Sequence, residues 1–288
     1  MRTDKMTECL LITVVSLALL GVANAAGASE PDVDEIVRRS NLVAYYQGKD
    51  GRAEVEMTIV DSQDRERTRE LIILRRDDRP DEAENEEDFE KDQYTGDQRY
   101  YVYFHRPSDW EDTVFMVWKN VEVDEKDNRW LYLPDLDLVK RIAAGDKRTS
   151  FAGSHFFYED ISGRNPAQDD HELVDTTDRY YVLESTPRED ADKVEFDHYR
   201  TYVHRDTFMP IQTDYFDEEG ENYRRYKVEE VEKVEGYLTV VQSRMEDLRD
   251  GGHTVLEYDD VEYDRDIPRD IFEERYLKNA PREYLGEN

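Results

Sequence analysis

The feature that most constrains the fold is a period-two alternation of apolar and polar residues that recurs along most of the chain. In residues 53–61 the side chains that point one way are Ala53, Val55, Met57 and Ile59, and polar residues stand between them. A β-strand places successive side chains on opposite faces, so each such segment predicts a strand with one face toward a core. Similar segments begin near residues 68, 99, 112, 128, 138, 179, 192, 209, 223, 237 and 253. Short turns such as Gly251-Gly252 separate many of them, which predicts one large, curved antiparallel sheet.

One longer helix is expected ahead of the strands. Ser29 is its expected N-cap and Gly48 its end, with an apolar face that includes Val33, Ile36 and Val37. No Pro- or Gly-rich linker divides residues 26–288, so we expect a single domain. The segment 114–118 is apolar on both faces, which predicts a central strand covered on both sides, with the N-terminal helix as one cover. A second, short helix is expected over residues 268–277.

The first 25 residues have the pattern of a cleaved signal peptide. Arg2 and Lys5 precede an apolar run from Leu10 to Val22, and Ala23-Asn24-Ala25 fits a signal peptidase site. The run is shorter than the about 20 apolar residues that span a membrane, although a retained N-terminal anchor is the alternative. The only cysteine, Cys9, lies in this segment, so the exported chain is expected to have no disulfide. The pattern predicts a periplasmic protein.

The composition is strongly acidic. Asp and Glu number 71 against 39 Lys and Arg, which gives a formal net charge of -32. Such a surface repels phosphate, so nucleic acid is excluded as a partner. The acidic residues are spread over nearly the whole length, which favours a solvated surface adapted to high salt over a site for a cationic partner. The acidic loop 81–92 lacks the residue order of a calcium loop, and the sequence leaves open whether it binds cations.

Motifs that would indicate catalysis are missing from the sequence. It contains no G-x-S-x-G, H-E-x-x-H or C-x-x-C motif and no glycine-rich phosphate loop. His198 and His204 share one face of an expected strand, but six residues separate them by about 20 Å, which is too far to share a metal. Carboxylate pairs are too frequent here to indicate a glycosidase. We therefore expect no enzyme, no metal and no cofactor; a hydrolase acting on lipid or glycan is the least favoured alternative.

The segment from Trp130 to Ile161 combines bulky rings with small residues. It begins as strand, turn and strand around Pro134, and small residues such as Gly145 and Gly153 then stand near the rings of residues 151–158. Small residues permit movement and large rings anchor a loop, so the segment suits a flap over an apolar space. It suits an ordinary core loop equally well, and composition alone leaves both interpretations open.

The same segment resembles the signature of the outer membrane lipoprotein-sorting family, the larger LolA-like periplasmic proteins. The matching residues are Trp130, Leu131, Tyr132, Leu133, Pro134, Leu136, Val139, Arg141, Ile142, Ser150, Phe151, Gly153, Ser154, Phe156, Tyr158, Glu159, Asp160 and Ile161. The segments EVEMTI, YVYFHRPSDWEDTVFMVWK and YDDVEYDRDIPRDIF also fit, so the resemblance covers nearly all of residues 26–288. It implies a mainly β fold in which a curved antiparallel sheet forms a half-open β-barrel, as in LolA and LolB, with a few helices over its mouth.

The resemblance also implies a function. It predicts a monomeric carrier that receives acyl chains of a lipoprotein or lipid in an apolar cavity and moves them toward the outer membrane. Transient contact with membrane surfaces and with an inner-membrane exporter of the resistance-nodulation-division (RND) or ABC type is implied as well. The family's lid-locking Arg cannot be placed, although Arg141 and Arg148 lie near the motif. The expected cavity wall and flap residues are Phe115, Val117, Trp130, Tyr132, Leu133, Phe151, Phe156 and Phe157.

An alternative function belongs to a different class. The chain would then be a periplasmic accessory protein that docks on an RND-type exporter through its outer surface and holds no ligand. Both alternatives need the same fold, and they differ in whether the inner side of the sheet contains an accessible apolar space.

Overall fold

The computed structural model describes residues 30–78, 96–188 and 194–286. The expected signal peptide and the acidic loop 81–92 lie outside these ranges, so both stay predictions. From Asp32 onward the chain forms one compact unit. None of the helices within the described ranges has the length and hydropathy of a membrane span.

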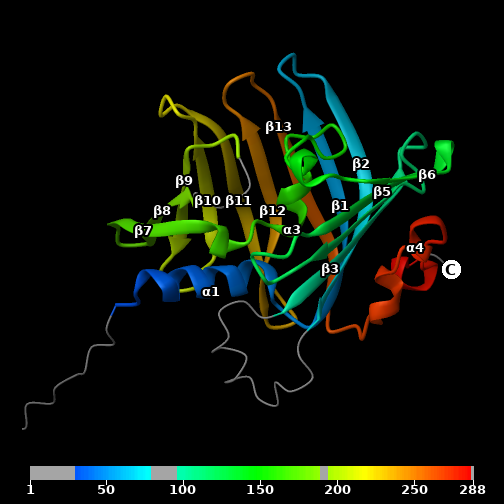
Figure 1. The fold of residues 1–288 in the computed structure, drawn as a ribbon, viewed down its shortest axis with the longest axis horizontal. Coiled ribbons are helices and arrows are strands. Elements are labelled where there is room, and N and C mark those ends of the chain that lie inside the picture. Colours follow the sequence, from blue (N-terminus) through cyan, green and yellow to red (C-terminus); the bar gives the residue numbers. More distant parts are fainter. Residues whose placement is uncertain (1–29, 79–95, 189–193, 287–288) are drawn as a thin grey trace, which may run out of the picture. The chain divides into compact units, whose positions relative to one another are not determined.

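One antiparallel sheet carries the fold (Figure 1). Its strands lie in the order β6-β5-β4-β3-β2-β1-β13-β12-β11-β10-β9-β8-β7, so β6 and β7 are the two edges and the sheet is not closed. The expected mainly β, half-open barrel is confirmed. The strands are β1 (Asp50–Val60), β2 (Glu66–Asp78), β3 (Asp97–Arg106), β4 (Val114–Lys119), β5 (Asn128–Leu133), β6 (Leu138–Arg141), β7 (Asp169–Thr176), β8 (Tyr180–Pro187), β9 (His198–His204), β10 (Pro210–Phe216), β11 (Asn222–Val234), β12 (Tyr237–Asp247) and β13 (His253–Tyr263).

The strand that the sequence pattern did not predict is β7. It pairs only with β8, as an edge strand does. Most of its residues from Glu172 to Thr176 are exposed, with Leu173 as the main apolar residue that packs inward. An edge strand with so little buried surface lacks the alternation that identified the other strands.

The short connecting elements lie mostly between β5 and β7. They are η1 (Pro134–Leu136), η2 (Ala144–Asp146), α3 (Tyr158–Ser162) and η3 (Pro166–Gln168). Residues 143–168, called the flap segment below, connect β6 to β7, and Figure 1 shows α3 in front of the sheet with α1. The face of the sheet that α1 and the flap segment cover is called the inner face.

The inner face of β1 to β5 is filled by rings from the flap segment. Phe151 lies 5.4 Å from Phe115 between ring centroids and 5.7 Å from Phe104. Tyr158 lies 5.1 Å from the Phe115 ring, and these rings form one cluster with Val117. The flap segment therefore contributes to a packed core at this end of the sheet.

The outer face of the same strands is covered by the C-terminal residues. Tyr101, Met116 and Trp130 pack against Phe272 and Leu277, which belong to the segment formed by η4 (Arg269–Phe272), α4 (Arg275–Lys278) and α5 (Arg282–Leu285). In place of the single short helix expected at residues 268–277, the chain forms the 3-10 turn η4 and the short helix α4, with Glu273 extended between them. Strand β4 is covered on both sides as expected, but the covers are the flap segment and this C-terminal segment.

The N-terminal helix α1 (Val33–Tyr45) does not cover β4, and that expectation was wrong. Its buried residues Ile36 and Val37 pack with Leu183 of β8 and Val203 of β9 instead. The backbone N–H of Glu35 donates to the Asp32 side chain at 2.9 Å, so Asp32 is the N-cap. Ser29, the expected cap, lies outside the described residues. An apolar stripe shows that a helix packs, but not on which strands.

Candidate functional site

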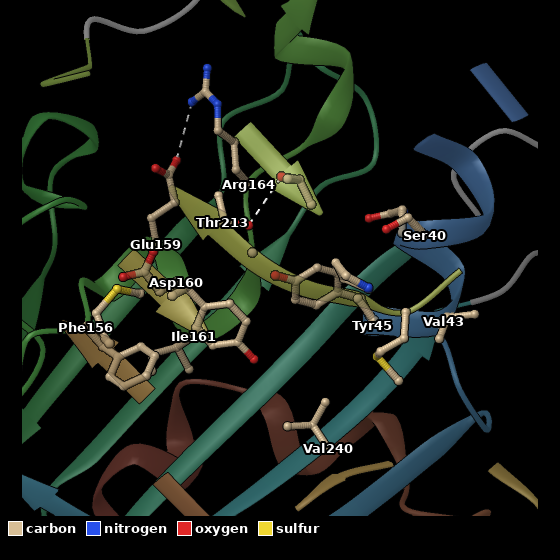
Figure 2. A pocket seen from close by; sticks show the side chains of 18 of the residues that line it. Ser40, Val43, Tyr45, Phe156, Glu159, Asp160, Ile161, Arg164, Thr213 and Val240 are labelled. Atoms are coloured by element: carbon tan, nitrogen blue, oxygen red, sulfur yellow. Dashed lines mark hydrogen bonds and ion pairs between the residues drawn. The ribbon is translucent and has the colours of Figure 1, made fainter. Parts of the chain in front are cut away.

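A cavity of about 430 Å³ is enclosed by α1, the flap segment and the inner face of the sheet (Figure 2). Its volume falls within the range of about 300–1,000 Å³ that is typical of pockets for small ligands. The strands that contribute to it are β1 to β3 and β7 to β13. The aliphatic and methionine side chains of its lining are Val37, Val43, Ile73, Ile161, Leu183, Met209, Leu238, Val240, Met245, Leu256 and Val261.

Tyrosine is prominent in this lining. Burial raises the pKa of each of these phenols, to about 12 for Tyr223 and Tyr258, so all of them stay neutral near pH 7. A neutral tyrosine presents an apolar ring and one hydroxyl group, which suits a ligand that is mostly apolar with some polar atoms. The tyrosines are Tyr45, Tyr100, Tyr199, Tyr215, Tyr223, Tyr226, Tyr258 and Tyr263.

The side of the cavity formed by α3 is charged. Glu159 of α3 lies 2.9 Å from Lys147 Nζ and 3.2 Å from Arg148 Nε, and all three side chains are less than one-tenth exposed. Burial by itself would raise the pKa of the Glu159 carboxyl, but Lys147, Arg148 and Arg164 lower it below its usual value. Glu159 is therefore ionised and holds the flap segment together from within.

Arg164 links the flap segment to the edge of the sheet. Its guanidinium donates to both carboxylate oxygens of Asp169, at 2.7 and 2.8 Å, and Tyr199 donates to the same carboxylate at 2.8 Å. Glu159 lies 3.8 Å from Arg164 on the other side, an ion pair drawn in Figure 2. Arg164 therefore has a fixed position at the rim of the lining.

Arg224 of β11 ties the flap segment to the strands of the opposite wall. Its guanidinium forms an ion pair with Asp160 and donates to the carbonyl of His155 at 3.1 Å. It also stacks 3.9 Å from the centroid of the Phe157 ring. This single arginine contacts three residues of the flap segment, so movement of the flap must break several interactions at one place.

Tyr45 closes the cavity between α1 and α3. Its ring packs directly on Gly163, the residue after α3, so closely that a Cβ atom at Gly163 would overlap Tyr45 Cζ. Gly163 has φ 73° and ψ 156°, a backbone conformation that is strained for every residue except glycine. Lys119 is buried behind this contact and donates to the Ser162 carbonyl at 2.8 Å.

The C-terminal end of α1 is anchored to the sheet by Arg75 of β2. Arg75 donates to the carbonyls of Tyr45 at 2.7 Å and Gly48 at 3.0 Å, and also to that of Gln47. Asp77 lies 2.7 Å from Arg75 and is itself fully buried. The end of α1 is thus fixed, which keeps Tyr45 over the cavity.

The structure does not bring the eight expected ligand residues together. Phe156 and Phe157 belong to the cavity lining. Phe115, Val117 and Phe151 lie in the filled core beside it, and Leu133 packs against that core. Trp130 and Tyr132 lie on the outer face with the C-terminal segment, and Trp130 packs edge-on to Trp118 at 4.8 Å.

The cavity-lining residues that sequence reasoning missed are mainly the tyrosines of β9 to β13, together with Arg224. Strands such as β9 and β10 place Tyr199, Thr201, Thr213 and Tyr215 toward the cavity, on one face of each strand. The signal available in the sequence was a strand face rich in Tyr rather than in Leu, Ile or Val. Within the described ranges no group of three or more His, Cys, Asp and Glu is arranged to hold a metal ion.

Comparisons with known proteins agree with this geometry. A family model described as "Uncharacterized protein" matches residues 96–279, more than half of the chain. The chain belongs to this family. No curated protein matches the sequence.

Several solved structures share the fold. A DUF1329 family protein from Desulfovibrio piger is 26% identical, with 85% of this chain and 97% of that chain covered and a TM-score of 0.73. A domain from Vibrio parahaemolyticus, named for outer membrane lipoprotein sorting, is 21% identical over 85% and 97% of the two chains, with a TM-score of 0.70. A LolA superfamily protein from Nitrosomonas europaea is 17% identical over 84% and 97%, with a TM-score of 0.61. The LolA-like fold expected from the sequence is confirmed.

Proposed function

We propose that the chain is a periplasmic carrier that binds the acyl chain of a lipoprotein or lipid in the cavity under α1 and the flap segment. The observation that carries this proposal is the cavity itself, an accessible space of about 430 Å³ with a largely apolar and aromatic lining. Transfer of each CH₂ group from water into such a space is favourable by about 0.8 kcal/mol. A carrier protein of this kind would deliver its cargo toward the outer membrane without making or breaking a covalent bond.

The named relatives support the proposal at the level of the fold. The similar structures from Vibrio parahaemolyticus and Nitrosomonas europaea carry names that refer to lipoprotein sorting and to the LolA superfamily. A protein with that role would be exported, contact membrane surfaces transiently and receive cargo from an inner-membrane exporter of the RND or ABC type. We propose the same for this chain, acting as a monomer and not as an enzyme.

The ligand wall that we propose differs in part from the expectation drawn from the sequence. Phe156 and Phe157 remain as ligand contacts from the flap segment. The opposite wall comes from β12 and β13, where Val240 and Leu256 line the cavity. Phe115 and Phe151 would act indirectly, because they hold the flap segment on the sheet.

Filling the cavity with protein atoms tests the proposal. Val240→Trp places a large ring in the lining, whereas Val255→Trp puts the same ring on the other face of the neighbouring strand β13, where Val255 alternates with the lining residue Leu256 in a regular stretch of the ladder. We expect Val240→Trp to lower the affinity for a fluorescent fatty acid by tenfold or more. Val255→Trp should bind it like the wild type.

Native mass spectrometry of protein purified from its producing cells gives an independent readout. A co-purifying lipid that is present in the wild type and in Val255→Trp but missing from Val240→Trp supports the carrier. A folded wild type that never binds an acyl chain, yet co-purifies with an exporter, would favour the accessory function instead.

A further inference from the structure

Cationic side chains gather around α3 although the protein as a whole is strongly acidic, with a formal net charge of -32. Lys147, Arg148, Arg164 and Arg224 are each at least about seven-eighths buried as side chains. The partners that face them are the carboxylates of Glu159, Asp160 and Asp169, together with the half-exposed Glu195. The four cations thus face three buried carboxylates and the half-exposed Glu195, so the excess of acid that marks the sequence as a whole is absent here.

Two of these arginines have a buried nitrogen that makes no hydrogen bond, although Nη1 of Arg164 lies 3.8 Å from a carboxylate oxygen of Glu159. Nη1 of Arg164 and Nε of Arg224 are buried and have no hydrogen-bond acceptor among the described residues. Such nitrogens are not confined to the cavity, since Nε of Arg69 is in the same state outside the lining. A buried donor without an acceptor costs about 1–3 kcal/mol, so a ligand oxygen placed against Arg164 or Arg224 would remove that cost. Both arginines belong to the lining of the cavity.

The charged residues of the flap segment gather at one end of the lining, although Arg52, Arg75 and Glu262 add charge elsewhere in it. Figure 2 shows Glu159, Asp160 and Arg164 on one side of the cavity, with Val43 and Tyr45 on the other and Val240 apart from the charges. An amphiphile fits this arrangement better than a plain hydrocarbon does. Its chain would lie along the aliphatic and tyrosine wall while its head group meets the cations.

We propose that the cavity is selective for acyl chains with an anionic head group, carboxylate or phosphate, which Arg164 and Arg224 bind beside α3. This inference rests on the proposed carrier function and specifies its class of ligand. The head group competes with Asp160 for Arg224, which also holds the Phe157 ring and the His155 carbonyl. Binding of the head group therefore loosens the tie between β11 and the flap segment.

Three probes with the same chain length test the inference on the wild-type protein. They are hexadecanoate, a lysophosphatidate with a hexadecanoyl chain, and the neutral hexadecanol. Hydrogen bonds to charged groups are about twice as strong as neutral ones, so we expect at least one anionic probe to bind about tenfold or more tightly than the alcohol. Which of the two binds better distinguishes a carboxylate from a phosphate source.

Variants locate the selectivity. Arg224→Gln should reduce the preference for the anionic probe by about tenfold, whereas Asp160→Asn, which removes the competing carboxylate, should increase it severalfold. Arg200→Gln is the matched control, since Arg200 forms an ion pair with Glu184 at 2.7 Å on the same sheet but lies outside the lining. If Arg224→Gln fails to fold, the affinities of the wild type and of Asp160→Asn for the three probes still test the inference.

The outcomes separate this inference from the proposed function. Equal affinity for the alcohol and both anions would overturn the inference and leave the carrier intact. Failure of all three probes to bind would remove the carrier function as well. If the preference for the anionic probe disappears in molar salt, it arises from surface charge, because buried ion pairs are screened far less than exposed ones. The same conclusion would follow if Arg200→Gln lowered the preference as much as Arg224→Gln does.

Discussion

Truncation of two phenylalanines should separate the filled core from the wall of the cavity. Phe115 of β4 is fully buried, and its ring lies 5.4 Å from Phe151 and 5.1 Å from Tyr158. Phe156 is 4% exposed but lines the cavity. Phe115→Ala and Phe156→Ala remove the same atoms from two sites with similar solvent exposure, so differences in the result report on packing.

The expected magnitudes follow from what surrounds each ring. Phe115→Ala leaves a new void inside a packed cluster, and such changes cost about 3–5 kcal/mol in the free energy of unfolding. Phe156 already borders an open space, so its loss extends an existing cavity and costs mainly the transfer of the side chain, about 1.5–3 kcal/mol. For affinity the order reverses, because only Phe156 contacts the proposed ligand.

Urea unfolding at constant salt gives the free energies, and titration with a fluorescent fatty acid gives the affinities. We expect the larger loss of stability for Phe115→Ala and the larger loss of affinity, severalfold or more, for Phe156→Ala. Equal losses of stability, together with unchanged affinity in Phe156→Ala, would refute the division into core and cavity wall.

Three further predictions concern the closure of the cavity, a buried lysine and the surface charge. Gly163→Ala should destabilise the protein by about 1–3 kcal/mol, because the backbone at φ 73° and ψ 156° is strained for alanine and the new Cβ atom meets the Tyr45 ring. In thermal unfolding, the additional substitution Tyr45→Ala should recover part of this loss. Burial lowers the pKa of Lys119 from 10.5 to about 8, although the negative charge of Asp127 acts in the opposite direction. The Lys119 amino group therefore binds its proton more tightly in the unfolded chain than in the folded protein. Stability should therefore rise between pH 8 and pH 10.5 by up to about 3 kcal/mol relative to Lys119→Met, and parallel pH profiles of the two proteins would contradict this. Because the net charge is -32, the thermal midpoint should rise markedly from low to molar salt, and a flat response would exclude the high-salt interpretation.

The sheet could be predicted from the sequence because its strands alternate, and alternation is a local property. The exception, β7, pairs along one side only and carries exposed residues at Glu172 and Val174, so the pattern is weak there. The position of α1 could not be predicted, since its apolar face matches any apolar strand surface. Contacts between Ile36 and the β8–β9 region depend on tertiary packing that periodicity does not encode.

The candidate site could be predicted only in part, for the same reason. Phe151 and Phe156 are five positions apart in one irregular segment and belong to the same buried cluster, yet only Phe156 also lines the cavity. Outside regular strands no period assigns a ring to a face. Within strands the alternation does assign side chains to two faces, but it does not identify which face is the inner one. Trp130 of β5, which we expected in the cavity wall, lies on the outer face with Phe272.

The central claim is that an acyl chain enters the cavity between α1, the flap segment and the sheet. A crystal structure of the protein with a fatty acid brominated near its chain end tests this most directly, because the anomalous signal of bromine marks the position of the chain. The account predicts a bromine peak inside the cavity, close to Val240 and Leu256, with the carboxylate toward Arg164 and Arg224. A saturating ligand whose bromine lies on the outer surface, with the cavity unchanged, would contradict it.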